Sequence, residues 1–123
     1  MELIPAKYFD FQGTLVDVRG IRSLLDGPNK NFDAFHRATA SCPPITWVVA
    51  EARRAHAEGF AVLFGTGMNM KYKRIATWWL ADHGVTVDEF EMRPNDDFCT
   101  DYLLKRRMRD RWKKKYAIVH AYD

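Results

Sequence analysis

The sequence has no long apolar run. Its hydrophobic stretches are all much shorter than the roughly 20 residues that a helix needs to cross a bilayer. The amino terminus, from Met1 to Pro5, also lacks the charged and then apolar pattern of a secretory signal. We therefore expect a cytoplasmic protein without a membrane partner.

Cysteine and histidine are also scarce. The two cysteines, Cys42 and Cys99, form no C-x-x-C pair, and we expect both to be reduced. The histidines show no metal-ligand spacing, which favours ordinary packing or surface positions for all of them: His36, His56, His83 and His120. The pattern argues against a zinc site and against a disulfide-based scaffold.

What is present suits one globular unit. The 123 residues are 47% hydrophobic and 14% aromatic, so residues 1–123 are expected to form a single domain. The net charge is only +3, but eight basic residues and the acidic Asp110 lie between Lys105 and Lys115. That segment carries +7, so the rest of the chain carries −4.

Strand and helix patterns alternate along the chain. Short apolar runs predict strands at about 6–11, 60–64, 85–92 and 116–122, whereas helical spacing predicts helices at about 32–39, 45–58 and 71–83. Asp33 is expected to cap the first helix, and Asp96 or Thr100 a fourth that extends to about Lys114. The alternation predicts an α/β three-layer sandwich with a short parallel sheet in the order 4-1-2-3. Residues 16–44 are expected to form a small cap-like insertion after the first strand.

Polar groups follow three of the predicted strands. Asp10 ends the first strand, Thr66 follows the second within Gly65-Thr66-Gly67, and Asp123 ends the fourth. Lys105 lies on the helix before that last strand. The carboxyl ends of parallel strands meet at one edge of a sheet, so these side chains are expected to converge there. A carboxylate nucleophile, a hydroxyl, an ammonium and a second carboxylate suit phosphoryl transfer.

Several of these segments resemble the motifs of haloacid-dehalogenase-type phosphohydrolases. Asp10-x-Gln12-Gly13-Thr14 is similar to motif one, which reads D-x-D-G-T, and Phe64 to Gly67 is similar to motif two. Lys105 corresponds to motif three and His120 to Asp123 to the start of motif four. Met92-Arg93-Pro94 and the tryptophan-rich helix resemble the phosphatase domain of polynucleotide kinase 3′-phosphatases and their phage relatives.

The resemblance implies a role for each matched residue. Asp10 would attack phosphorus and bind Mg²⁺, together with the backbone carbonyl of Gln12 and the carboxylate of Asp123. Thr66 and Lys105 would contact the phosphate. The implied function is hydrolysis of a phosphomonoester on a nucleotide or polynucleotide end through an aspartyl-phosphate.

Three departures from the motifs predict impaired activity. Gln12 replaces the acidic residue that protonates the leaving oxygen, and an amide has no titratable proton near neutral pH. Met68 stands where the relatives carry an arginine, and motif four ends at Asp123 without its second carboxylate. The alternative is therefore a catalytically inactive module, such as a phage-encoded one, that binds a nucleic acid or a protein assembly.

The basic segment allows two interpretations. Arg106, Arg109 and Lys113 could bind a nucleic-acid backbone, or the charges could only keep the outer face of the helix solvated. In the second case Leu103, Leu104, Met108 and Trp112 would face the sheet. Lys105 is open to the same choice between a phosphate contact and a solvated face, and for Arg93 we expect a salt bridge to Asp96 or Asp97. Strand 116–122 would form an exposed sheet edge, which predicts self-association or a protein partner.

Overall fold

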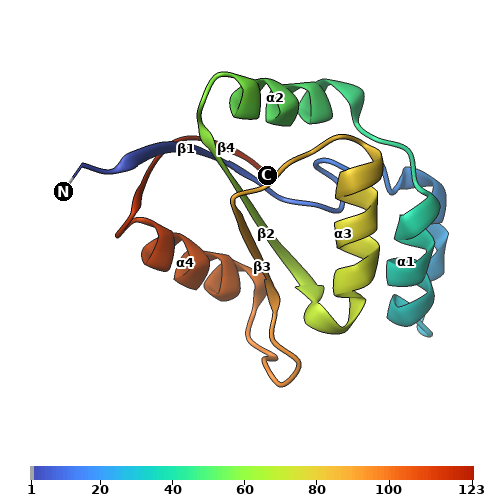
Figure 1. The fold of residues 1–123 in the computed structure, drawn as a ribbon. Helices are drawn as coiled ribbons and strands as arrows, with labels where there is room; N and C mark the ends of the chain where they lie inside the picture. The colour runs from blue at the N-terminus through green and yellow to red at the C-terminus, as the bar shows by residue number, and fades with distance from the viewer. Residues whose placement is uncertain (1) are drawn as a thin grey trace.

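The computed structural model describes residues 2–123, and a four-stranded sheet forms its centre (Figure 1). The strands are β1 (Ile4–Phe9), β2 (Ala61–Asn69), β3 (Glu89–Arg93) and β4 (Tyr116–Tyr122). All neighbouring pairs are parallel, and the order is β3-β2-β1-β4. This confirms the predicted α/β class and the order 4-1-2-3.

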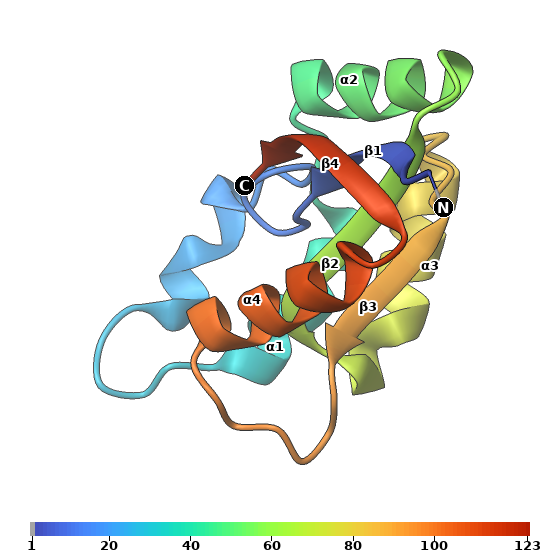
Figure 2. The ribbon, with the colours of Figure 1, turned by 90° about the vertical axis from the view of Figure 1, so that its left-hand side faces the viewer.

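Helices cover both faces of the sheet, which makes three layers (Figures 1 and 2). On one face lie α2 (Thr46–Ala57) and α3 (Lys73–Asp82), and on the other lies α4 (Asp101–Trp112). A further helix, α1 (Phe32–Ala38), lies beside α3. No helix within residues 2–123 is long and apolar enough to cross a membrane.

Alternation along the strands divides the core between these two faces. Phe9 and Phe64 pair in register and pack in the larger cluster under α2 and α3. Their neighbours Tyr8 and Leu63 also pair, but they point the other way and pack against α4. Successive side chains of a strand point to opposite faces, so a sheet covered on both sides buries every position. This explains why the first two strands appear in the sequence as continuous apolar runs.

Local signals explain most of the helix ends. Gly59 (φ +87°) and Gly84 (φ +70°) adopt the left-handed conformation just after α2 and α3, as expected for stop residues. Thr100 caps α4, since its Oγ1 accepts a hydrogen bond of 3.3 Å from the Leu103 amide. The expectation for α1 was wrong: Asn31, not Asp33, accepts the capping hydrogen bond, at 3.0 Å.

The second strand is longer than predicted. Gly65-Thr66-Gly67 is part of β2 and not a turn, and the strand continues to Asn69. These glycines allow close packing: a Cβ on Gly65 would lie 3.0 Å from the Met108 sulfur, and one on Gly67 would collide with the Asp101 carboxylate. The third strand is shorter than predicted, because residues 85–88 only lead into it.

The segment expected as an insertion holds α1 between two 3₁₀ turns, Arg19–Leu25 and Thr39–Ser41. It is tied to the core by Trp79, which is 2% exposed and donates a hydrogen bond of 2.9 Å from Nε1 to the Cys42 carbonyl. Both cysteines are free thiols. At the other side of the sheet, β4 forms an edge with Val119 58% exposed, and pairing of this edge with another chain remains a prediction.

Candidate active site

A cleft of about 710 Å³ opens at the carboxyl ends of the strands. Asp10 and Gln12 enter it from the end of β1, residues 66–69 from β2, and Lys105 from α4. The segment from Arg93 to Asp101 and two residues of α1, Phe32 and His36, complete its wall. Four of the residues predicted for the site from the sequence therefore line the same cleft.

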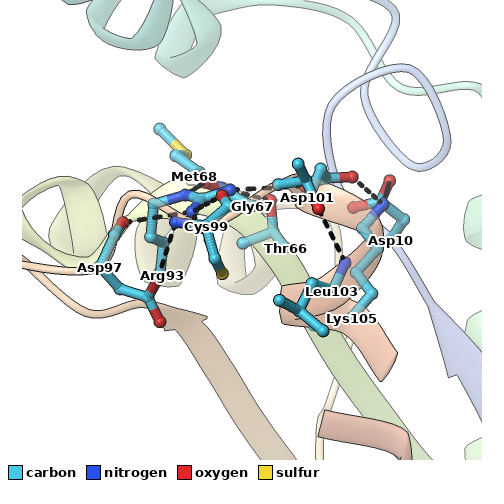
Figure 3. A network of polar contacts seen from close by, with 12 residues as sticks. Asp10, Thr66, Gly67, Met68, Arg93, Asp97, Cys99, Asp101, Leu103 and Lys105 are labelled. Carbon is cyan, nitrogen blue, oxygen red and sulfur yellow. Dashed lines mark hydrogen bonds and ion pairs between the residues drawn. The ribbon is translucent and has the colours of Figure 1, made fainter. Parts of the chain in front are cut away.

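Lys105 is the cationic centre of this cleft (Figure 3). Its Nζ lies 2.7 Å from Asp10 Oδ2, 3.0 Å from Asp123 Oδ1 and 3.2 Å from Asp101 Oδ2. The residue is only 8% exposed, which rules out the solvated helix face considered from the sequence. Burial alone would lower the pKa of Lys105, but the hydrogen bond and charge of Asp10 outweigh it and raise that pKa. The ammonium therefore stays charged.

Asp10 is held at both carboxylate oxygens. The Phe11 amide donates to Oδ1 at 2.7 Å, and Lys105 donates to Oδ2. Burial raises the pKa of Asp10 to about 6, against the opposing effect of the Lys105 hydrogen bond. The group is thus largely ionised at neutral pH and oriented by two donors, which suits a carboxylate nucleophile.

Thr66 contributes a buried hydroxyl to the cleft. The residue is 2% exposed, and its Oγ1 accepts a hydrogen bond of 3.1 Å from the Met68 amide. This leaves the hydroxyl hydrogen to donate to a ligand. Met68 itself is 2% exposed and packs in the core cluster under α3. The position that carries an arginine in the relatives is here part of the apolar interior.

The Gln12 side chain is bonded to the segment around α1. Its Nε2 donates to Thr39 Oγ1 at 2.9 Å and lies 3.0 Å from His36 Nδ1. Thr39 uses its own hydroxyl hydrogen for the Phe35 carbonyl, at 3.0 Å, so its Oγ1 can accept from Gln12. Both Gln12 amide hydrogens therefore have acceptors, Thr39 Oγ1 and His36 Nδ1. Burial, followed by the charge of Lys71, lowers the pKa of His36, which favours a neutral ring. Sequence reasoning missed His36, because no spacing links it to motif one.

Arg93 fixes the wall of the cleft by hydrogen bonds to backbone carbonyls. It does not form the expected salt bridge to Asp96 or Asp97. Its Nε donates to the Gly67 carbonyl at 2.9 Å, and Nη1 donates to the carbonyls of Asp97 and Cys99 at 3.2 and 2.7 Å. Planar guanidinium groups suit several carbonyls at once. The Asp97 carboxylate instead accepts from the Cys99 amide at 3.0 Å.

A magnesium site at this edge of the sheet stays a prediction. Within residues 2–123, no group of three or more His, Cys, Asp or Glu side chains is placed to hold a metal. Asp10 and Asp123, however, direct one oxygen each at the same Lys105 ammonium, so two carboxylates converge on a cation. Mg²⁺ prefers oxygen ligands and is commonly held by one or two carboxylates with several waters. Asp10, Asp123 and the Gln12 backbone carbonyl would supply such a set.

The residues predicted to bind nucleic acid lie outside the cleft, on α4. Arg106 and Lys113 are exposed, and Arg109 is half-buried. The apolar side of α4 is largely as expected, because Leu104, Met108 and Trp112 are buried against the sheet. Leu103 was assigned to that side wrongly, since it is 38% exposed.

Comparison with solved structures shows that this is a haloacid-dehalogenase-like fold, as the motifs predicted. A chain of the Pnkp1/Rnl/Hen1 RNA repair complex matches with a TM-score of 0.80 and 22% identity, over 97% of this protein and 35% of that chain. The class C acid phosphatase from Bacillus anthracis with tungstate bound gives 0.80 and 13%, over 99% of this protein and 52% of that chain. The protein thus spans between about a third and a half of these solved chains. Sequence comparison gives no match among protein-family models or curated proteins.

Proposed function

We propose that the protein is a phosphatase that hydrolyses a phosphomonoester at the end of a nucleotide or polynucleotide, with Mg²⁺ as cofactor. The observation that carries this proposal is the convergence of Asp10, Thr66 and Lys105 in one cleft. They supply a carboxylate nucleophile with a pKa of about 6, a buried hydroxyl donor and a buried ammonium. The fold likeness to a phosphatase and to an RNA repair complex supports the choice of reaction and substrate.

In the first step, an oxygen of Asp10 forms a bond to phosphorus while the bond from phosphorus to the ester oxygen breaks. The electron pair leaves with that ester oxygen. Lys105 and Thr66 stabilise the negative charge on the phosphoryl oxygens. Bound Mg²⁺ would neutralise further charge on the phosphoryl group. In the second step, water attacks the phosphorus of the aspartyl-phosphate, which releases phosphate and restores the carboxylate.

Gln12 limits both steps. It cannot give a proton to the leaving oxygen or take one from the attacking water, so these protons must be exchanged with solvent. Loss of a general acid or base typically lowers a rate by a factor of about 10² to 10⁴. An aryl phosphate, whose leaving oxygen needs no proton, should therefore be hydrolysed faster than an alkyl ester.

The alternative is an inactive module that binds the phosphorylated end without turning it over. It is favoured by two observations: both amide hydrogens of Gln12 are bonded to Thr39 and His36, and Met68 is buried in the core. At these two positions the side chains support the fold, whereas the motifs have an acidic residue and an arginine that take part in the reaction.

The two functions are separated by assays with Mg²⁺ on a 3′-phosphorylated oligonucleotide and on an aryl phosphate. Phosphate release that Asp10→Asn abolishes supports the phosphatase. No release from either substrate, in a protein that still binds the phosphorylated oligonucleotide, supports the binding module instead.

A further inference from the structure

One side of α4 carries a stripe of cationic and aromatic side chains, which we call the basic face: Tyr102, Arg106, Arg109 and Lys113. Spacings of four, three and four residues place these side chains on one side of the helix. Tyr102 is 71% exposed, Arg106 and Lys113 are exposed, and Arg109 is half-buried. The basic face extends about 17 Å along the helix axis, at 1.5 Å per residue.

Three other basic residues of this segment are paired with acids of the sheet or the preceding loop, whereas Lys114 forms no ion pair within residues 2–123. Arg111 lies 2.8 Å from Glu91, and Arg107 lies 3.6 Å from Asp97. Lys115, just before β4, lies 3.8 Å from Glu89. The side of α4 that faces β3 is therefore largely neutralised within the chain.

The basic face is much less neutralised. Within residues 2–123, Arg106 and Arg109 form no ion pair, and Lys113 only reaches Asp110 at 4.0 Å. A ligand that brings anionic oxygens along this side of α4 would meet unpaired donors.

The basic face lies on the same helix as two residues of the cleft, Asp101 and Lys105. Tyr102 follows directly after Asp101, which lines the cleft, and Arg109 lies one helical turn after Lys105. A strand whose phosphorylated end lies beside Lys105 can therefore extend along α4. Regularly spaced cations with one exposed aromatic side chain match the phosphates and bases of a single strand.

We propose that the basic face binds the sugar–phosphate backbone of the single-stranded nucleic acid whose terminal phosphate enters the cleft, with Tyr102 stacking on a base near that end. This rests on the proposed function, because it names the polymer that the cleft would serve. Arg106, Arg109 and Lys113 contact successive phosphates, and guanidinium groups are suited to such contacts.

The test measures binding of a labelled, 3′-phosphorylated single-stranded oligonucleotide by fluorescence anisotropy between about 50 and 200 mM salt. The double variant Arg106→Gln/Lys113→Gln is compared with Arg107→Gln/Arg111→Gln, which removes the same charge from the paired side of α4. We expect the first to weaken binding about tenfold or more and to reduce the salt slope by about 1.4, at about 0.7 per phosphate contact. We expect less than a twofold change in the second.

Tyr102→Ala separates base stacking from general charge attraction. Loss of one stacked base should weaken binding at least about fivefold, since such contacts contribute at least about 1 kcal/mol. Equal losses in the two double variants would overturn the proposal. So would equal affinity of the wild-type protein for poly-glutamate or anionic lipid vesicles, because the face would then attract any polyanion.

This test does not depend on turnover. If the double variants differ in oligonucleotide binding while the wild-type protein hydrolyses no phosphate ester, the basic face stands and the phosphatase proposal fails. The opposite outcome is that the wild-type protein and all variants hydrolyse an aryl phosphate equally, and that none of them, the wild-type protein included, binds the oligonucleotide. In that case the phosphatase proposal stands and the basic face fails.

Discussion

The Nζ atom of Lys105 lies 2.7 Å from Oδ2 of Asp10, although 95 residues separate them in the chain. The contact joins α4 to the end of β1 and fixes the orientation of the proposed nucleophile. It also places an ammonium where an incoming phosphoryl group would need positive charge.

Replacing Lys105 leaves three carboxylates without their shared cation. We expect Lys105→Met to lower the free energy of unfolding at pH 7 by about 2–3 kcal/mol. This is less than the usual cost of breaking a buried ion pair, because Asp101 and Asp123 reach solvent. Urea denaturation measures this, with the exposed Lys113→Met as the matched control. Added Mg²⁺ should restore more stability to Lys105→Met than to the wild-type protein. Equal responses of the two proteins to Mg²⁺ would contradict the ligand set of Asp10 and Asp123.

The raised pKa of Asp10 predicts the pH dependence of activity. A carboxylate nucleophile must be ionised, so at low Mg²⁺ concentration kcat/KM for an aryl phosphate should rise with pH up to about 6 and then level off. Saturating Mg²⁺ favours the ionised carboxylate and should move this rise to lower pH. A profile at low Mg²⁺ that is flat between about pH 4.5 and 7 would contradict this assignment.

The same group affects stability in the opposite sense. Its pKa is about 6 in the folded protein and 3.8 without the fold, so folding takes up a proton between these values. The stabilising contribution of Asp10 is present below pH of about 4 and is lost as the pH rises through about 6. Unfolding curves of the wild-type protein and Asp10→Asn should diverge across this window, and parallel curves would contradict the shift.

The sheet and the meeting of Asp10, Thr66 and Lys105 could be predicted because apolar runs end on polar residues, and parallel strand ends share one edge. The extent of β2 could not, since Gly65-Thr66-Gly67 has the composition of a turn. Its glycines are explained only by the side chains of Met108, 43 residues after Gly65, and Asp101, 34 residues after Gly67, and sequence spacing does not reveal that packing.

Two residues of the cleft, Asp101 and His36, were not predicted from the sequence. Asp101 was missed, although its spacing of four residues from Lys105 on one helix is a signal that could have identified it. His36 had no such signal, because its contact with Gln12 depends on how the segment around α1 folds over the sheet. Local patterns predict elements and strand ends, whereas contacts between a loop insertion and the core depend on tertiary packing.

Restoring a carboxyl group at position 12 should raise turnover. We expect Gln12→Asp to increase kcat on an alkyl phosphate by about 10² or more, because a general acid and base becomes available. Gln12→Asn, with the same size but no titratable proton, is the matched control and should give no increase. With an aryl phosphate, whose leaving oxygen needs no proton, slow hydrolysis of the aspartyl-phosphate in the wild-type protein should appear as a burst of phenol release. Equal rates for the Asp and Asn variants would show that position 12 does not take part in proton transfer.

The two glycines in the middle of β2 should differ in their tolerance of alanine. A methyl group on Gly65 meets the Met108 sulfur and the Trp112 ring at 3.0 Å within a packed core, so Gly65→Ala should cost about 1–3 kcal/mol of stability. A methyl group on Gly67 collides with the end of the Asp101 side chain, which can move toward solvent, and makes an ordinary contact of 3.6 Å with Arg93 Nη2. Gly67→Ala should therefore cost less stability but disturb the Lys105 ion pairs. Thermal unfolding of both variants tests this, and the reverse order would contradict the packing of α4 on β2.

Trp79 and Trp78 provide a final pair, because adjacent residues of one type have different surroundings. Trp79 is 2% exposed and its Nε1 donates to the Cys42 carbonyl, whereas Trp78 is 64% exposed. Trp79→Phe would leave that buried carbonyl without a donor and should destabilise the protein by about 1–3 kcal/mol. Trp78→Phe should change stability by about 0.5 kcal/mol or less.

Because the Cys42 contact holds the segment that carries His36, Trp79→Phe should also raise KM for the oligonucleotide substrate. A loss of stability in Trp78→Phe equal to that in Trp79→Phe would show that this hydrogen bond does not fix the segment over the cleft.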